Sequence, residues 1–179
     1  MKKIFSYFFQ ALFIYILFIL GRILGKYLSR KFFSFIFLKL GPLFRSKKTI
    51  EKNLDIYNKN LDKNEKKKII SNMWKNYGVT FIEYIFLNSF RKNNSHIRIE
   101  GDKNLQQIIN YKKPVIFISG HFSNFELMSM EITKKNIPLA TIYRPLNNIF
   151  LNPLMEFLRR KFVCRNQIKK GIRGVKDSI

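Results

Sequence analysis

The chain has 179 residues and a mass of 21.5 kDa, the size of one ordinary domain with at most a small appendage. Apolar residues make up 46% and aromatic residues 16%, which excludes intrinsic disorder for most of the chain. The net charge of +23 predicts an anionic partner, such as acidic lipid, acidic protein or nucleic acid. One Cys and two His argue against a disulfide framework and against a resident metal site built from thiolates or several histidines.

The first 50 residues differ from the rest, because they contain ten Lys or Arg and no acidic residue. Residues 4–20 form an apolar run interrupted by Ser6 and Gln10, at the short end of the about 17 to 25 residues that span a membrane. A signal peptide shares this pattern, but Leu20-Gly21-Arg22-Ile23 offers no small-residue cleavage site. We therefore expect an amino-terminal membrane helix.

A second apolar stretch, residues 32–44, contains Lys39 and is broken by Gly41-Pro42, so it is too short to span a membrane. Basic side chains beside bulky apolar ones favour a helix at anionic headgroups, where each Lys or Arg contributes about 1 kcal/mol. A buried core helix is the alternative. We interpret residues 1–48 as a membrane anchor with an interfacial basic segment, and residues 49–179 as a second domain.

Residues 51–87 have apolar side chains near helical spacing and predict two scaffold helices. Asp62 is a plausible N-cap for the second helix, and the basic run 63–68 that follows is interpreted as a solvated face. Residues 96–100 alternate and predict an edge strand, with His96 as an ordinary surface histidine.

The following segment predicts a strand at residues 114–119, a helix at 123–135 and a second strand at 139–143. A strand, a helix and a strand in this order normally give parallel strands with a right-handed crossover. Functional groups in such sheets gather at the carboxyl ends of the strands. This rule points to His121 and Arg144.

His121 and Glu126 are five positions apart, so in one continuous helix their side chains would lie some 140° apart. They can meet if His121 lies on the turn before the helix and Glu126 lies in the first helical turn. The carboxylate then accepts one imidazole proton, and the other ring nitrogen is a base for a substrate hydroxyl. The competing interpretation is a helix capping box from Ser123 to Glu126, with His121 as a turn residue.

Two whole motifs support the catalytic interpretation. Gly120-His121-Phe122-Ser123-Asn124-Phe125-Glu126 resembles the H-x4-D/E motif of glycerolipid-type acyltransferases, and Tyr143-Arg144-Pro145-Leu146-Asn147-Asn148 follows at the distance of their second motif. Together they resemble the late acyltransferases of lipid A biosynthesis, the lauroyl and myristoyl transferase family. Ser123 and Phe125 stand where that family commonly has Gly and Trp. Further similarities are the apolar anchor, Asn53-Leu54, Glu83, Ile99-Glu100-Gly101 and Leu158-Arg159-Arg160.

The resemblance implies an α/β fold, a glycerolipid acyltransferase-like sheet with flanking helices, preceded by the membrane helix. It also implies transfer of a fatty acyl group from the thioester of acyl carrier protein to a hydroxyl of a phosphorylated glycolipid, with no other cofactor, at the cytoplasmic face of the bacterial inner membrane. His121 would be the general base and Glu126 would orient it. The substrate-binding residues that it implies are Ser123, Asn124, Tyr143 and Arg144.

Arg144 would hold an anionic group of the acceptor through its bidentate guanidinium, and the alternative is a surface arginine beside a turn proline. Acyl carrier protein is acidic, so Arg159, Arg160 and Lys161 would steer it to the site. Since chains of this family continue further, we expect the domain 49–179 to be truncated at its carboxyl end.

Three other functions stay open at this point. A glycerol-phosphate or lysophospholipid acyltransferase would use the same chemistry on another acceptor. An inactive membrane-binding remnant would keep the anchor without catalysis. A nucleic-acid binder would explain the net charge, but the sequence contains no recognised nucleic-acid motif, so we expect no nucleic-acid partner.

Overall fold

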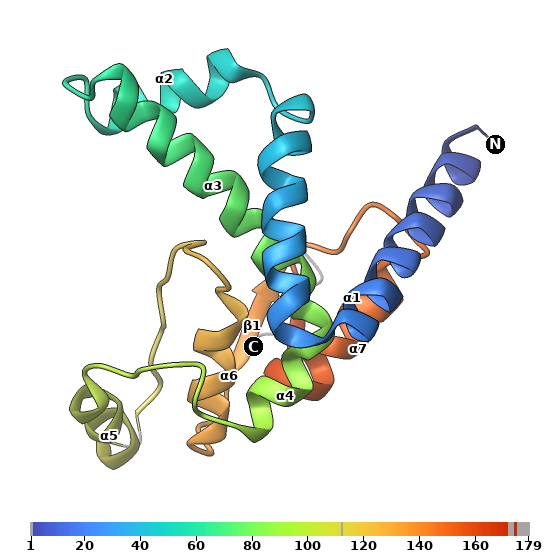
Figure 1. Cartoon of the computed structure of the whole chain (residues 1–179). Coiled ribbons are helices and arrows are strands. Elements are labelled where there is room, and N and C mark those ends of the chain that lie inside the picture. The colour runs from blue at the N-terminus through green and yellow to red at the C-terminus, as the bar shows by residue number, and fades with distance from the viewer. Residues whose placement is uncertain (1, 112, 172–173, 175–179) are drawn as a thin grey trace. The chain divides into compact units, whose positions relative to one another are not determined.

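The computed structural model describes residues 2–111, 113–171 and 174 (Figure 1). Contacts divide the chain into two units, one joining residues 1–14 to residues 86–179 and the other holding residues 15–85. The described chain is mostly helical, with one small sheet of two strands. Its elements in order are α1 (Lys2–Leu40), η1 (Gly41–Leu43), α2 (Lys47–Tyr57), α3 (Lys63–Glu83), η2 (Tyr84–Phe86), α4 (Leu87–Lys92), α5 (Asp102–Tyr111), α6 (Glu126–Lys134), β1 (Ala140–Tyr143), α7 (Asn152–Leu158), the π-helical η3 (Arg159–Val163) and β2 (Asn166–Lys169).

Both amino-terminal apolar stretches belong to α1, which changes direction at Gly25 (Figure 1). Gly25 has φ 71° and ψ 169°, a non-helical conformation that glycine adopts without a Cβ clash. The sequence predicted separate elements at residues 4–20 and 32–44. The structure corrects this to one helix with a kink. By length and composition, residues 2–43 form the one helix in the described part of the chain that could cross a membrane.

In the unit of residues 15–85, α3 packs on α1 through the ring of Phe81. Its centroid lies 5.1 Å from that of Phe18, 5.7 Å from that of Phe33 and 5.4 Å from that of Phe37. A Cβ at Gly78 of α3 would collide with the backbone carbonyl of Phe33, so glycine is what permits this close approach. Aromatic contacts of this kind add to the stability gained from burial alone.

The second apolar stretch has one buried and one exposed face. Phe33 is fully buried, while Phe35 is 59% exposed. The buried Glu83 of α3 forms an ion pair with Arg30 of α1, with Oε1 3.1 Å from Nε. Residues 26–40 therefore pack on α3 along one side and expose further apolar side chains, together with basic ones, on the other, so the segment has features of both interpretations that the sequence left open.

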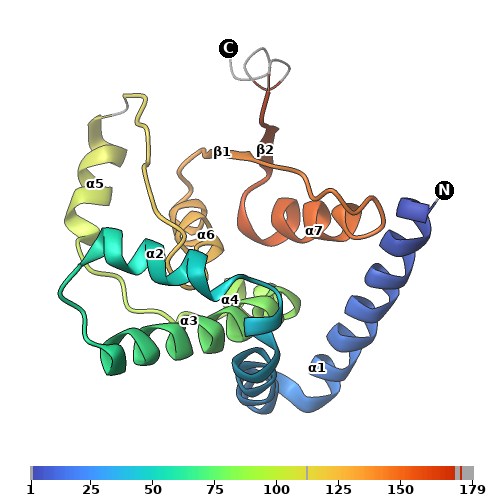
Figure 2. The same ribbon diagram turned by 90° about the horizontal axis from the view of Figure 1, so that it is seen from above.

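The two predicted scaffold helices are confirmed as α2 and α3, which lie side by side (Figure 2). Lys66 Nζ lies 2.6 Å from Asp55 Oδ1 across this contact. Asp62 is the N-cap of α3, as predicted, and forms a capping box with Glu65.

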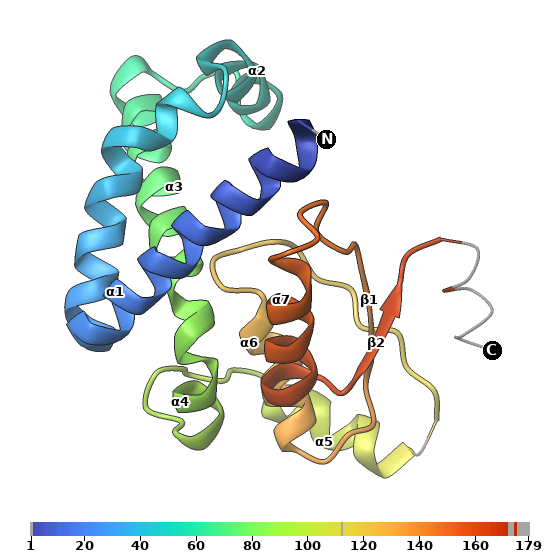
Figure 3. The same ribbon diagram turned by 90° about the vertical axis from the view of Figure 1, so that its right-hand side faces the viewer.

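In the unit that contains residues 86–179, β1 and β2 pair in parallel, with Ala140 opposite Asn166 and Tyr143 opposite Lys169. The connection between them contains α7, and α6 and α7 lie on the same side of the two strands (Figures 2 and 3). The predicted strand at residues 139–143 is confirmed as β1. The parallel strands are thus connected through α7, whereas the sequence predicted a connection through the helix at residues 123–135.

Two predicted strands are wrong. Residues 114–119 and 96–100 have no strand structure, and Ile116 and Ile118 are 88% and 92% exposed. A strand needs backbone partners on a neighbouring strand, and in the described residues the sheet consists of β1 and β2 alone. The described chain is therefore mostly helical with a small parallel sheet, and the larger acyltransferase-like α/β sheet stays a prediction.

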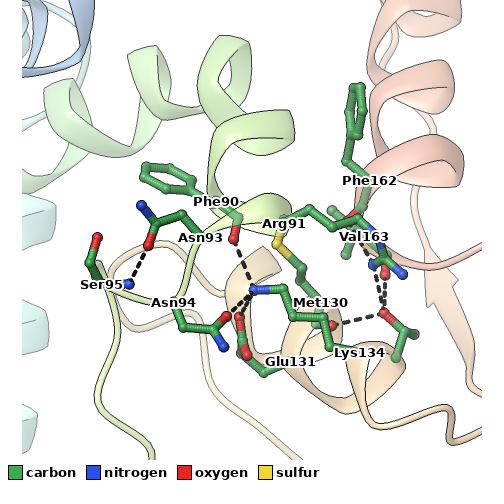
Figure 4. Close-up of polar contacts among 11 residues, drawn as sticks. Phe90, Arg91, Asn93, Asn94, Ser95, Met130, Glu131, Lys134, Phe162 and Val163 are labelled. Carbon is green, nitrogen blue, oxygen red and sulfur yellow. Dashed lines mark hydrogen bonds and ion pairs between the residues drawn. The ribbon is translucent and has the colours of Figure 1, made fainter.

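Lys134 forms a buried ion pair within α6 and also connects α6 to α4 by a hydrogen bond (Figure 4). Lys134 Nζ lies 2.6 Å from Glu131 Oε1 on the same helix, and it also donates to the carbonyl of Phe90 at 2.9 Å and to Asn94 Oδ1 at 3.0 Å. The side chains of Lys134 and Glu131 are 15% and 10% exposed. Since both charges are largely removed from water, each depends on the other.

We expect Lys134→Ala to lower the free energy of unfolding by about 3 to 5 kcal/mol, because it leaves the Glu131 carboxylate buried without its cation. The neighbouring Lys135 pairs with Asp102 at 3.1 Å on the surface, so Lys135→Ala is a matched control expected to cost less than about 1 kcal/mol. Denaturant unfolding in neutral detergent measures both values. Equal losses in the two variants would contradict the special role of the buried pair.

Candidate active site

The first motif lies in the turn that leads into α6. His121 is exposed on this turn, and Glu126 is the first residue of the helix. This is the arrangement that the five-residue spacing requires for an imidazole and a carboxylate to meet. The helix boundary differs from that of a capping box, because Phe125 rather than Ser123 is the N-cap residue. Ser123 has a positive φ of 50°, which makes the sharp turn at this point.

The imidazole of His121 lies against the ring of Phe125, with the ring centroids 4.4 Å apart. Its exposure leaves it accessible to a substrate from solvent or from a lipid surface. The hydrogen bond between His121 and Glu126, and the catalytic roles of the two residues, stay predictions.

The Glu126 carboxylate is buried and paired with Arg159, the first residue of η3. Arg159 Nε lies 2.6 Å from Glu126 Oε1, and the two side chains are 15% and 7% exposed. This position corrects the expectation that Arg159 steers an acidic partner, because its charge faces inward. A carboxylate has two oxygens and about four lone-pair sites, so this pairing leaves Glu126 able to accept an imidazole proton as well.

The second motif begins at the carboxyl end of β1. Tyr143 is buried, and the guanidinium carbon of Arg159 lies 5.8 Å from the centre of its ring. Arg144 follows directly and is exposed, as expected where successive side chains point to opposite faces. Arg159 therefore links the two motifs through Glu126 and Tyr143. Of the other predicted residues, Asn124 is buried and Ser123 is exposed.

Tyr143 and Glu156 of α7 influence each other's titration. Burial, together with the neighbouring Glu156 carboxylate, raises the pKa of Tyr143 to about 12. Burial acts to raise the pKa of Glu156 as well, but the Tyr143 hydroxyl, Lys169 and Arg160 outweigh it and hold this pKa below its ordinary value. At neutral pH the Tyr143 hydroxyl is therefore neutral and the Glu156 carboxylate is charged.

Among the described residues, no group of three or more His, Cys, Asp or Glu side chains could hold a metal ion. The family model described as bacterial lipid A biosynthesis acyltransferase matches residues 2–177. The chain belongs to this family. Membership confirms the family inferred from the two motifs, indicates an acyltransferase and implies a lipid acceptor. Comparisons with curated proteins and with solved structures give no match.

We expect the free energy of unfolding to fall as the pH rises from about 10 towards about 12, because the unfolded chain then loses the Tyr143 proton while the folded chain retains it. Tyr143→Phe removes this contribution and flattens the profile. Tyr57→Phe, at a side chain that is 80% exposed, is the control and keeps the profile of the native chain. Unfolding measured across this pH range tests the assignment, and identical profiles for Tyr143→Phe and the native chain would overturn it.

Proposed function

We propose that this protein is an O-acyltransferase that moves a fatty acyl group from the thioester of acyl carrier protein to a hydroxyl of a lipid A precursor. The observation that supports this best is the arrangement around α6. An exposed histidine on the turn precedes a buried glutamate that an arginine holds in place. Family membership independently indicates acyl transfer and a lipid acceptor.

In the proposed reaction, His121 takes the proton of the acceptor hydroxyl as the oxygen attacks the carbonyl carbon of the thioester. The tetrahedral intermediate then collapses, the carbon–sulfur bond breaks, and the imidazolium returns its proton to the leaving thiolate. The products are an ester and a thiol. The electron pair of the hydroxyl oxygen forms the new carbon–oxygen bond, the pair of the carbon–sulfur bond leaves with the sulfur, and the proton passes from the hydroxyl to the thiol. No nucleophile from the protein and no further cofactor is required.

Glu126 orients the imidazole and stabilises its protonated form during this transfer. Arg159 acts on Glu126 rather than on the substrate, since its Nε contacts the carboxylate at 2.6 Å. Because both side chains are buried, the carboxylate keeps one position beside the turn. A general base needs such a fixed partner to present the correct ring nitrogen to the hydroxyl.

Arg144 binds an anionic group of the acceptor. It is exposed at the carboxyl end of β1, directly after Tyr143. A guanidinium makes two parallel hydrogen bonds to a phosphate, which fixes orientation as well as supplying charge. A phosphorylated disaccharide acceptor offers a phosphate of this kind. Ser123 and Asn124, on the turn before α6, are the other proposed substrate contacts.

Contacts between residues 2–14 of α1 and the rest of their own unit support a position at the membrane surface. Asn148, just after the second motif, donates from Nδ2 to the carbonyl of Tyr7 at 2.8 Å. The ring of Phe150 lies 5.6 Å from that of Phe8. A helix that spanned the bilayer from residue 4 to residue 20 would carry Tyr7 about 20 Å from residue 20. These contacts therefore support an arrangement in which residues 2–14 of α1 lie in the membrane interface beside the site. The membrane face that we propose is the cytoplasmic face of the inner membrane.

Acyl carrier protein is the proposed donor and is acidic. Arg160 and Lys161 are exposed and can attract it, although Arg160 also pairs with Glu156 at 3.3 Å. Attraction of this kind raises the rate of encounter more than the affinity.

His121→Ala should reduce acyl transfer by at least about 10²-fold, because the acceptor hydroxyl loses its base. His96→Ala, which removes the other histidine, is the matched control and should retain turnover, since the His96 ring packs on Phe90 outside the motif. Turnover is measured with acyl carrier protein thioester and lipid A precursor, and membrane binding by flotation with vesicles. Near-normal turnover by His121→Ala would overturn the mechanism. Turnover with glycerol phosphate or lysophospholipid alone would reassign the acceptor.

Arg144→Lys should lower kcat/KM for the acceptor about tenfold while leaving the KM for the thioester unchanged, because lysine keeps the charge but loses the forked contact. Arg45→Lys, at an exposed position in the amino-terminal half, is the control and should change neither value. Steady-state kinetics with each substrate varied in turn separates the two effects. An equal loss for both substrates would remove Arg144 from acceptor binding.

A further inference from the structure

A cavity of about 320 Å³ opens at the end of the sheet opposite the two motifs. We call it the basic pocket, and its lining includes Arg91, Arg160, Lys161, Val163, Cys164 and Arg165. Its wall includes Leu139, just before β1, and Asn166, at the start of β2. His121 and Arg144 lie instead at the start of α6 and the end of β1. Since β1 has four residues, about 13 Å of strand separates the two ends.

The charge of the basic pocket is strongly one-sided. Four of its lining residues are cations, and none of the described residues that line it is acidic. Arg160 forms an ion pair with Glu156, but among the described residues no ion pair joins Arg91, Lys161 or Arg165 to a carboxylate. A concave surface lined by charges of one sign concentrates the field and attracts a counterion.

Hydrogen bonds hold Arg91 in the wall of the basic pocket. Arg91 Nη1 donates to Thr133 Oγ1 at 3.0 Å and to the carbonyl of Phe162 at 3.1 Å, and Figure 4 shows Arg91 between α6 and the strand-side end of η3. Both hydrogens of this nitrogen are used in these bonds, and Nε and Nη2 carry the remaining donors of the guanidinium. Arg91 is therefore fixed by the fold before any ligand arrives, which lowers the entropy lost on binding.

Cys164 forms an inert part of the floor of the basic pocket. Its thiol is buried and donates to the carbonyl of Leu139 at 2.8 Å. Burial raises the pKa of the Cys164 thiol, so it stays neutral and adds no negative charge. Val163 is also buried. The floor is thus apolar and neutral apart from Arg91, and the exposed cations form the rim.

We propose that the basic pocket binds a phosphate group, either free, on a small ester or on a lipid headgroup, at a site separate from the proposed catalytic motif. Guanidinium groups match phosphate geometry through paired hydrogen bonds, and three of the four cations are arginines. A volume of about 320 Å³ suits a phosphate with a small organic substituent. An acidic protein surface would not need the recessed Arg91. The proposal is independent of acyl transfer, because binding alone defines it.

The test uses the full chain in neutral detergent and inorganic phosphate as the probe, titrated by calorimetry at constant ionic strength. The native chain should show saturable binding at one site. Lys161→Gln with Arg165→Gln should weaken it about tenfold or more, since two charge-assisted contacts are lost. Lys67→Gln with Lys68→Gln removes the same charge from exposed positions of α3 and should change the affinity less than about twofold. Circular dichroism checks that both variants are folded.

A second measurement separates the sources of the phosphate. Flotation with phosphatidylcholine vesicles, with and without phosphatidic acid, compares the same two double variants. A loss confined to the pocket variant on phosphatidic acid assigns the site to a lipid headgroup, while a loss seen with inorganic phosphate alone assigns it to a soluble phosphate. The proposal is overturned if the native chain shows no saturable phosphate binding, or if both double variants lose equally. It is also overturned if the pocket variant loses affinity only for acyl carrier protein, because the rim then serves an acidic protein.

Discussion

The ion pair between Glu126 and Arg159 holds the proposed site together. Glu126 begins α6, Arg159 begins η3, and the guanidinium of Arg159 also lies over the ring of Tyr143 at the end of β1. Three segments that are far apart in sequence therefore meet at one buried arginine. A buried charge without its partner is costly, so the pair requires these segments to keep their mutual positions. The exposed side chains on either side of it, His121 and Arg144, are placed by this arrangement and do not stabilise it.

The sequence predicted local features of this protein better than its long-range pairing. The N-cap at Asp62, the strand at 139–143 and the position of Glu126 in the first turn of a helix all depend on neighbouring residues, and all three agree with the structure. β2 was missed because Asn166-Gln167-Ile168-Lys169 contains a single apolar side chain and shows no alternation of apolar and polar residues. Residues 114–119 have the composition of a buried strand, but pairing decides whether a strand forms, and composition does not specify the partner.

In the candidate site, too, the sequence predicted local features better than contacts between distant residues. The motifs identified His121, Glu126, Tyr143 and Arg144 by spacing. The inward direction of Arg159 accompanies its pairing with Glu126, 33 positions away in sequence, and could not be inferred from the run Leu158-Arg159-Arg160. The net charge also did not predict where on the protein an anionic partner binds. Arg159 is used internally, Arg30 pairs with Glu83, and the rim of the basic pocket presents its cations to solvent. A count of basic residues therefore predicts an anionic partner but not the surface that binds it.

The hydrogen bond from Asn148 to the carbonyl of Tyr7 ties the loop after Arg144 to the second turn of α1. If α1 lies in the interface, this contact fixes the depth of the loop relative to the headgroups of a single leaflet. A helix held in this way does not tilt when the bilayer becomes thinner or thicker, as a spanning helix does. The protein would then sense the packing and charge of the leaflet on which it lies, and glycolipids in the opposite leaflet would be out of its reach until they crossed the bilayer.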